Sequence, residues 1–304
     1  MTRPLKVGLQ LPEVEYVARW PEQREMARRA EAIGLDSIWV GDHLLYRGDG
    51  LPTRGPWEAW TTLAALAAVT ERVQLGPLVA STSFSSPGLI AKKAATIDEI
   101  SGGRLILGLG AGWNEDEYRA YGYPFDHRVS RFEEAFTIIR SLLRDWRCDF
   151  HGTYFQLDDC ELLPRSTRPG GPPLMIGSQG PRMLSIALPH VQAWNAWFTW
   201  FGNHPDGYRA LRGEIDEACR AAGRDPSEVE RSVAVFVAFP GAQGRQLGDL
   251  STPEVEAFSG EPSVLAPALR AFADEGVAHV QLVLDPINAE TISALAPTLA
   301  LLDG

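Results

Sequence analysis

Residues 73–110 run VQLGPLVA (73–80), STSFSS (81–86), PGLIAKKAATIDEI (87–100), SGG (101–103) and RLILGLG (104–110). The first and last of these segments are short apolar runs, which are typical of buried strands. The middle segment starts with Pro87 and stops before Gly102 and Gly103, as helices commonly do. A helix between two strands joins them in parallel, so these residues predict a β–α–β unit.

The same alternation extends in both directions along the chain. We expect strands over residues 5–11, 36–41, 73–80, 104–109, 173–176, 191–196, 233–239 and 278–284. We expect helices over residues 21–33, 59–69, 87–100, 132–146, 181–188, 207–222, 264–273 and 289–302. Eight strand–helix units with right-handed crossovers predict a closed parallel (β/α)8 TIM barrel, with a doubly wound open sheet as the alternative.

The chain is longer than a minimal barrel. Such barrels typically take about 250 residues, and this chain has 304. Glycine and proline cluster near residues 44–57, 149–172 and 240–262, where we expect insertions. The alternating pattern around Gly152 predicts a small hairpin over residues 149–163. No hydrophobic gap divides the chain, so we expect one domain over residues 1–304.

Composition narrows the class of protein. The chain is 45% hydrophobic and 22% charged, with a formal net charge of −11, which argues against broad binding to nucleic acid or to anionic membranes. No apolar run approaches the ~20 residues of a membrane span, and no signal-peptide segment opens the sequence. Cys148, Cys160 and Cys219 show no CxxC spacing and cannot all pair, which indicates a reducing compartment. We therefore expect a cytoplasmic protein with a small-molecule substrate.

The active site of a barrel lies at the C-terminal ends of its strands. The fifth strand is followed directly by a turn into a helix, formed by Gly177, Ser178, Gln179, Gly180, Pro181 and Arg182. Free backbone N–H groups and the dipole at a helix N-terminus attract anions, and Arg182 adds positive charge. This turn is therefore predicted to bind phosphate. The alternative is a tight turn in which glycine serves only the backbone angles.

The fourth strand ends in GLGAGWN, residues 108–114. A dinucleotide-binding fingerprint is rejected because it needs a third glycine where Trp113 stands. Gly108, Gly110 and Gly112 have two interpretations that the sequence leaves open. They let a flat ligand approach the backbone, or they relieve crowding inside the barrel.

His43 follows the second strand and stands beside Asp42. No other histidine or carboxylate lies at ligand spacing, so no metal site is predicted. The position favours a catalytic role for His43, tuned by Asp42, over a purely structural one. No nucleophile elbow or cysteine–histidine pair supports hydrolysis. Aromatic side chains near the strand ends predict a substrate pocket for a flat or apolar ligand, formed by Tyr46, Trp57, Trp113, Trp194 and Trp197.

Several of these segments together resemble a known family. They are residues 34–43 (GLDSIWVGDH), 70–76 (TERVQLG), 87–104, 107–114 (LGLGAGWN), 173–177 (PLMIG) and 193–195 (AWN), with Arg128, Arg131 and Glu134. In this order the chain is similar to the bacterial luciferase-like superfamily of flavin- and deazaflavin-dependent oxidoreductases. The resemblance implies a (β/α)8 barrel with the cofactor at its C-terminal mouth and a homodimer. It also implies that Glu99, Arg104, Arg131 and Glu134 hold helices to the barrel.

The resemblance implies roles for residues near the mouth. In the deazaflavin branch the ring lies near a histidine matching His43. It leans on a bulge of the third strand, here Leu78, Val79 and Ala80, where a non-proline cis peptide is expected at or near Leu78–Val79. The segment Ala111, Gly112, Trp113 and Asn114 would line the ring or its ribityl chain, and the turn at 177–182 would meet the phosphate.

The implied activity is hydride transfer between coenzyme F420 and a small organic substrate. His43 would orient the ring or relay a proton. A reduced-FMN monooxygenase using dioxygen and a non-catalytic flavin-binding protein are the alternatives. The chain departs from the sugar-phosphate dehydrogenase branch, which has an acid in place of Trp113 and a tryptophan in place of Arg47.

Overall fold

The computed structural model describes residues 3–47, 50–166, 168–244 and 255–304. Its main sheet consists of β1 (Lys6–Gln10), β2 (Ser37–Val40), β3 (Gln74–Pro77), β4 (Ala80–Ser81), β5 (Leu107–Gly110), β8 (Leu174–Ile176), β9 (Ala193–Ala196), β10 (Glu230–Ala238) and β11 (His279–Asp285). The strand order is β3-β2-β1-β11-β10-β9-β8-β5-β4, and all neighbouring pairs are parallel.

The two ends of this sheet meet along the third barrel strand. That strand is made of β3 and β4, and the cis peptide bond between Leu78 and Val79 lies between them. β4 pairs with β5, and Leu75 of β3 forms a parallel bridge with Leu105. The sheet therefore closes into the predicted (β/α)8 barrel, and the open-sheet alternative is wrong. The cis peptide bond confirms the expectation drawn from the family resemblance.

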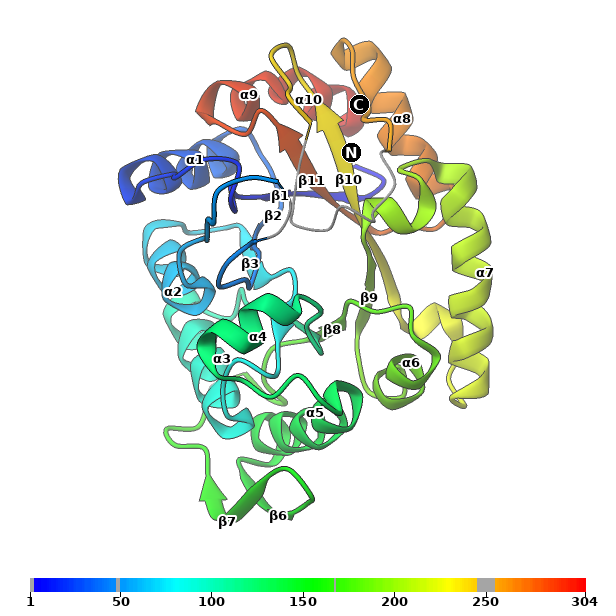
Figure 1. The fold of residues 1–304 in the computed structure, drawn as a ribbon. Helices are drawn as coiled ribbons and strands as arrows, with labels where there is room; N and C mark the ends of the chain where they lie inside the picture. The colour runs from blue at the N-terminus through cyan, green and yellow to red at the C-terminus, as the bar shows by residue number, and fades with distance from the viewer. Residues whose placement is uncertain (1–2, 48–49, 167, 245–254) are drawn as a thin grey trace.

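Helices surround the barrel (Figure 1). They are α1 (Trp20–Ala32), α2 (Ala59–Val69), α3 (Pro87–Ser101), α4 (Glu115–Tyr121), α5 (Arg128–Asp145), α6 (Pro181–Ala187), α7 (Pro205–Ala221), α8 (Pro262–Asp274), α9 (Ala289–Ala294) and α10 (Ala296–Asp303), with 3-10 turns η1 (Phe198–Phe201) and η2 (Pro226–Glu228). The expected last helix is divided in two because Pro297, in the first turn of α10, has no N–H to continue α9. α4 was not expected, because only Glu117 and Tyr118 of its seven residues are buried.

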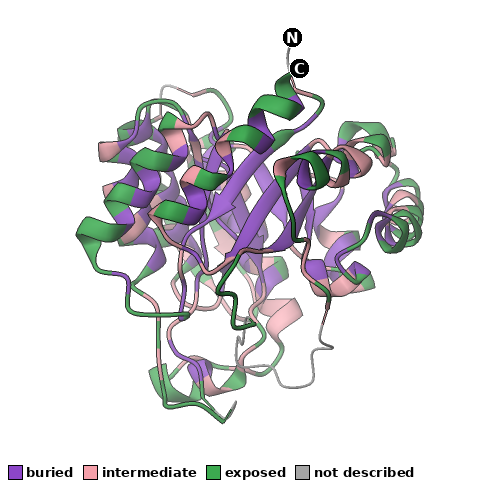
Figure 2. Ribbon diagram, turned by 90° about the horizontal axis from the view of Figure 1, so that it is seen from above, coloured by how far each residue is buried: buried purple, intermediate pink, exposed green. Residues whose placement is uncertain are grey.

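Two groups of buried side chains form the core. Most apolar side chains of the strands point outward and pack against the surrounding helices. The strands are therefore the most completely buried elements of the fold (Figure 2). A second, smaller cluster fills the barrel interior, and it consists of Trp39, Leu78, Ile106, Met175 and Ala193. Burial of such side chains stabilises a fold by about 25 cal/mol per Å² of apolar surface.

The glycines of the fourth strand serve this interior packing. A Cβ atom at Gly108 would lie 2.8 Å from a methyl carbon of Val79, and one at Gly110 would lie 2.9 Å from another. Both distances are shorter than real carbon contacts. The crowding interpretation is therefore confirmed for Gly108 and Gly110.

Polar side chains share the barrel interior. The His279 ring and the Trp39 indole each approach the Ser37 hydroxyl at 2.7 Å. Asn195 donates to the Ser232 hydroxyl at 2.9 Å, and Gln281 lies within hydrogen-bond distance of both. Burial lowers the pKa of His279 to about 3, so this ring is neutral in the folded protein. Its neutral state suits a site that is almost inaccessible to solvent.

The second predicted insertion contains the expected hairpin. β6 (Arg147–His151) and β7 (Gln156–Glu161) pair antiparallel beside the barrel (Figure 1). Glu134 of α5 accepts hydrogen bonds from the backbone N–H groups of residues 153–155, which fastens the hairpin turn to that helix. Of the third predicted insertion, residues 245–254 lie outside the described residues, as do 48–49 in the first.

Candidate active site

His43, directly after β2, stands between two carboxylates. Its Nδ1 atom lies 2.8 Å from a carboxylate oxygen of Glu117, the third residue of α4. Its Nε2 atom lies 3.8 Å from a carboxylate oxygen of Glu13, which follows β1. Donation from Nδ1–H to Glu117 fixes the imidazole ring and directs Nε2 to the side of Glu13.

The two carboxylates control the charge of His43. Burial alone would lower the pKa of His43, but the nearby charge of Glu13 and the hydrogen bond to Glu117 outweigh it and hold that pKa above its usual value. The site therefore favours the imidazolium form. Such a group can hold a proton on Nε2 near neutral pH.

Sequence reasoning did not single out Glu117, whose carboxylate contacts His43. Its carboxylate is almost completely buried, and it also accepts hydrogen bonds from the backbone N–H groups of Leu44 and Leu45. The available signal was the acidic run Glu115-Asp116-Glu117 directly after Asn114. Nothing in that run separates the buried acid from its two more accessible neighbours.

Glu13 was also missed, and it connects His43 to the end of β1. Its carboxylate accepts from the Tyr46 hydroxyl at 2.5 Å and from the Gln10 side-chain amide at 3.0 Å. A Cβ atom at Gly41 would lie 2.6 Å from this carboxylate, so a larger residue here would displace Glu13 from its position beside His43. The side-chain oxygen of Gln10 is buried and has no partner within the described part of the chain.

The Asp42 carboxylate is hydrogen-bonded to β4 and not to His43, the residue that it was predicted to tune. Its carboxylate accepts a 2.9 Å hydrogen bond from the backbone N–H of Ser81, which ties the end of β2 to β4. Burial raises the pKa of Asp42 to about 7, although the bond from Ser81 opposes the shift. Asp42 therefore acts on His43 only through its charge, and Glu117 is the residue that contacts the imidazole.

Aromatic rings line one side of His43. The ring centroids of His43 and Tyr46 are 4.9 Å apart, and those of His43 and Trp113 are 5.5 Å apart in an edge-on arrangement. Tyr46 is buried, whereas the side chain of Trp113 is 45% exposed. The structure thus brings these two predicted pocket residues to the histidine, with Trp113 on the solvent side.

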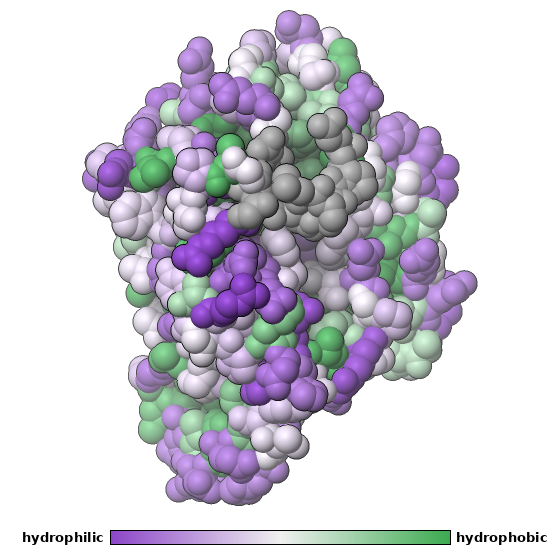
Figure 3. All heavy atoms as spheres, viewed as in Figure 1, coloured by the Kyte–Doolittle hydropathy of each residue, from purple (hydrophilic) through white to green (hydrophobic). Residues whose placement is uncertain are grey.

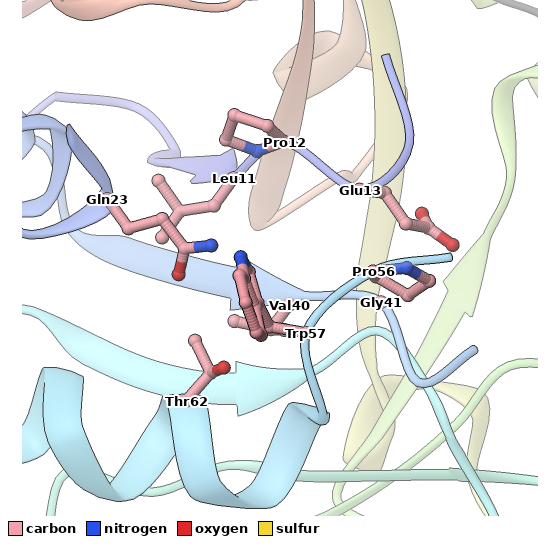
Figure 4. A pocket seen from close by; sticks show the side chains of 9 residues that line it. All are labelled: Leu11, Pro12, Glu13, Gln23, Val40, Gly41, Pro56, Trp57 and Thr62. Atoms are coloured by element: carbon pink, nitrogen blue, oxygen red, sulfur yellow. The ribbon is translucent and has the colours of Figure 1, made fainter. Parts of the chain in front are cut away.

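Trp57 lines a neighbouring pocket rather than contacting His43. Its indole N–H donates to the Ala18 carbonyl at 2.8 Å. Figure 4 shows the ring in the middle of the pocket, between Gln23 and Thr62. Glu13 and Gly41 belong to the wall of the same pocket, so it adjoins the histidine site.

Trp194 lies in β9 and Trp197 directly follows it, but the two side chains are in different environments. Trp194 has no exposed surface and packs in the core between barrel and helices, so the prediction that it lines a substrate pocket is corrected. Its indole N–H donates to the Ser178 carbonyl at 2.7 Å, which holds the turn after β8. Trp197 is partly buried and packs against the interior cluster, next to the barrel end.

The turn at residues 177–182 is accessible at the end of β8. The Gly180 backbone N–H donates to the Ser178 hydroxyl, Gln179 is exposed, and α6 begins at Pro181. The Arg182 guanidinium pairs with Glu133 of α5 at 2.8 Å, so its charge is shared with that helix.

Residues 111–114 position α4. The Gly112 carbonyl accepts from Arg128 at 2.6 Å, and Gly112 has a φ of 73°, which requires glycine. The Asn114 side chain donates to the Leu45 carbonyl at 2.9 Å, and the Ala111 carbonyl accepts from Tyr118 at 2.6 Å. These contacts fix the helix that carries Glu117.

The strand-three bulge faces the same end of the barrel. Leu78 and Val79 contribute to the interior cluster, and Ala80 is buried. A Cβ atom at Gly177 would lie 3.0 Å from Val79. The bulge therefore packs directly against the strand that leads into the exposed turn.

The outer face of α4 is polar. Glu115 and Asp116 form ion pairs with Arg119 at the surface. Figure 3 shows hydrophilic side chains gathered over this part of the molecule. Among the described residues there is no cluster of metal-ligating side chains and no helix long and apolar enough to span a membrane.

Comparisons with known proteins identify the family of the chain. A sequence model of the family described as luciferase-like monooxygenase matches residues 6–240. The F420-dependent glucose-6-phosphate dehydrogenase of Amycolatopsis mediterranei is 32% identical over 242 residues, which cover 77% of this chain and 69% of that protein. The pyrimidine monooxygenase RutA of Cronobacter sakazakii is 34% identical over 173 residues, or 55% of this chain and 50% of that protein.

A solved structure shares the fold over the whole chain. An F420-dependent secondary alcohol dehydrogenase, in complex with an F420-acetone adduct, has a TM-score of 0.81 at 20% identity and covers 100% of both chains. This structural match shows the fold, and the sequence model identifies the family. The chain belongs to the luciferase-like monooxygenase family.

Proposed function

We propose that this protein is an oxidoreductase that transfers a hydride between coenzyme F420 and a small organic substrate. The observation that carries the proposal is His43, fixed through Nδ1 by Glu117 at 2.8 Å and placed beside the aromatic side of the barrel end. The similarity to an F420-dependent dehydrogenase over 77% of the chain supports the choice of cofactor.

The residues at the barrel end fit a deazaflavin. Gln10 offers a buried acceptor oxygen that lacks a partner within the described residues, and the pyrimidine part of the ring carries an N–H donor. The exposed turn at 177–182 offers backbone N–H groups to the phosphate of the cofactor tail. When bound, F420 supplies the carbon that accepts or donates the hydride. Leu78 and Val79 would support the ring from the side of the bulge.

The chain's own residues would manage the proton. Hydride transfer to a carbonyl carbon, or from a carbon that bears a hydroxyl group, requires a proton to move on the oxygen. His43 can hold this proton on Nε2, because Glu117 occupies Nδ1 and Glu13 favours the charged ring. Tyr46 holds Glu13 in place through its hydroxyl. Trp113 would exclude water from the substrate.

A reduced-FMN monooxygenase is the second candidate, supported by the 34% identity to RutA. Titration of the purified protein with F420 and with FMN separates the two. We expect tight binding of F420 and reduction of F420 by a substrate without dioxygen. Tight binding of FMN alone, with substrate-dependent consumption of dioxygen, would overturn the first choice. Stoichiometric cofactor binding without any turnover would instead indicate a flavin-binding protein.

We also propose that the protein is a cytoplasmic homodimer. Leu89 and Ile100 on α3 are 48% and 46% exposed, and two copies could cover such side chains. The three cysteines are free thiols, as is usual in a reducing compartment. Light scattering should give twice the mass of the chain, and a monomer at micromolar concentration would contradict the dimer.

A further inference from the structure

The hairpin outside the barrel sets two of the three cysteines opposite each other. In the register of β6 and β7, Cys148 is the direct partner of Cys160, next to the pair Arg147 and Glu161. Directly opposed residues of an antiparallel pair have Cα atoms about 4.5–5.5 Å apart and side chains on the same face. A disulfide spans Cα separations of about 4.4–6.8 Å. The register therefore permits a bond between these two sulfurs.

The two thiols lie on the inner face of the hairpin. Cys148 is 7% exposed and belongs to the core cluster, and Cys160 packs against that cluster while remaining partly accessible. On the outer face, Arg147 forms ion pairs with Asp159 and Glu161 of the opposite strand. These ion pairs hold the two strands in the register that opposes the cysteines.

We propose that Cys148 and Cys160 form a reversible intrachain disulfide, which makes the hairpin a thiol modification site. The oxidant is a small-molecule disulfide of the glutathione type. The site lies outside the barrel end, so it is independent of the proposed hydride transfer.

The exchange proceeds in two displacements. The more accessible sulfur, on Cys160, attacks the oxidant as a thiolate and releases one molecule of thiol. The sulfur of Cys148 then displaces the second thiol and forms the bond between the two residues. Two protein thiols and one small disulfide thus become one protein disulfide and two small thiols. Burial, followed by the neighbouring Cys160, raises the pKa of Cys148, so the first attack falls to Cys160, and Cys148 reacts only when the mixed disulfide is held beside it.

Oxidation would constrain a contact with the barrel. The loop closed by the bond contains residues 153–155, whose N–H groups donate to Glu134 of α5. A cross-link between the strands removes open conformations of this loop. The hairpin amides should therefore exchange with solvent several-fold more slowly after oxidation.

The test uses the full-length protein in buffers of graded glutathione disulfide and thiol. After blocking of the remaining thiols in denaturant, digestion and mass spectrometry should find one linked peptide pair that contains Cys148 and Cys160 and has lost two hydrogen atoms. Cys219 is fully buried and lies 3.7 Å from Arg231. We therefore expect Cys219 to remain a free thiol and to be recovered with the blocking reagent attached. Glutathione attached to Cys160 without the link, or thiols that stay reduced in the most oxidising buffer, would overturn the proposal.

Matched variants complete the test. Cys219→Ser should keep the linked pair, and Cys160→Ser should abolish it together with the slower amide exchange of residues 147–161. If Cys160→Ser fails to fold, the mass spectrum of the unaltered protein still decides the matter. Slower exchange that persists in a folded Cys160→Ser protein would show that the bond is not its cause.

Discussion

The Glu117 carboxylate accepts a 2.8 Å hydrogen bond from the His43 ring, although the two residues are 74 positions apart in the chain. One lies at the end of β2 and the other on the short helix after β5. The contact exists because Gly112, Asn114 and Tyr118 seat α4 against the barrel end. Glu117 thus acts as a positioning residue for the candidate catalytic histidine.

Glu117→Gln should lower the pKa of His43 and slow turnover. The variant keeps the size of the side chain but removes the charge, so we expect the pKa of His43 to fall. We expect kcat/KM for F420-dependent turnover to fall about tenfold or more. NMR titration of the imidazole protons and a pH–rate profile measure the two effects.

The matched control is Glu115→Gln on the same helix. Glu115 is exposed and pairs only with Arg119 among the described contacts, so its loss should change neither the titration nor the rate. An unaltered pKa of His43 in Glu117→Gln would contradict the positioning role.

Trp113→Ala should weaken substrate use rather than folding. The indole is 45% exposed and meets His43 edge-on, so its loss opens the site to water. We expect kcat/KM to fall about tenfold, with a small change in the free energy of unfolding. Trp20→Ala, at the start of α1 and 37% exposed, is the control for loss of a surface tryptophan. Equal effects of the two variants on kcat/KM would count against a pocket at Trp113.

Gly180→Asp should weaken binding of the cofactor tail. A Cβ atom at Gly180 would lie 3.8 Å from the Ser178 hydroxyl oxygen and 4.0 Å from Met183, which are ordinary van der Waals contacts, and aspartate is a favourable residue at this N-cap position of α6. The fold should therefore persist, while the added carboxylate repels phosphate. We expect the Kd for F420 to rise about tenfold or more by fluorescence titration.

A deazaflavin that lacks the phosphate tail provides the comparison for this variant. Its affinity should be the same for the variant and the unaltered protein. Gly177→Asp is a poorer test, because its Cβ atom would press on Val79 at 3.0 Å and disturb the barrel. Unchanged affinity of Gly180→Asp for intact F420 would remove the phosphate from this turn.

The buried His279 and Asp42 should give opposite pH dependences of stability. The pKa of His279 is about 3 in the folded protein, which is below its value in the unfolded chain. The contribution of neutral His279 to the free energy of unfolding is therefore complete above about pH 6.5 and is lost as the pH falls. The folded pKa of Asp42, about 7, lies above its unfolded value, so its contribution is complete below about pH 3.8 and is lost as the pH rises. Between pH 4 and 6 the two effects oppose each other.

Urea denaturation of single variants separates these effects. Relative to His279→Gln, the free energy of unfolding of the unaltered protein should fall by up to about 1.4 kcal/mol for each unit of acidification from pH 6 to 4. Relative to Asp42→Asn, it should rise by a similar amount over the same interval. A pH-independent difference for either variant would contradict the corresponding burial effect.

The packing inside the barrel shows which features the local sequence pattern predicts and which it leaves undecided. The apolar alternation, Pro87 and the Gly102–Gly103 pair predicted the strand–helix units of a barrel but left an open sheet as the alternative, and the ends of the strands located His43, Tyr46 and Trp113. The same pattern could not decide between the two roles of Gly108 and Gly110. That decision depended on Val79, which comes from the adjacent strand.

The sequence by itself determined the order of strands and helices and the strand ends that carry the polar and aromatic residues, because both follow from short-range periodicity and from turn-forming residues. Only the tertiary structure decided which side chains meet. It joined His43 to Glu117 and Glu13, directed Asp42 to Ser81, and placed Trp194 in the core. These outcomes depend on closure of the sheet, which brings together residues whose separation in the chain contains no information about their distance in space.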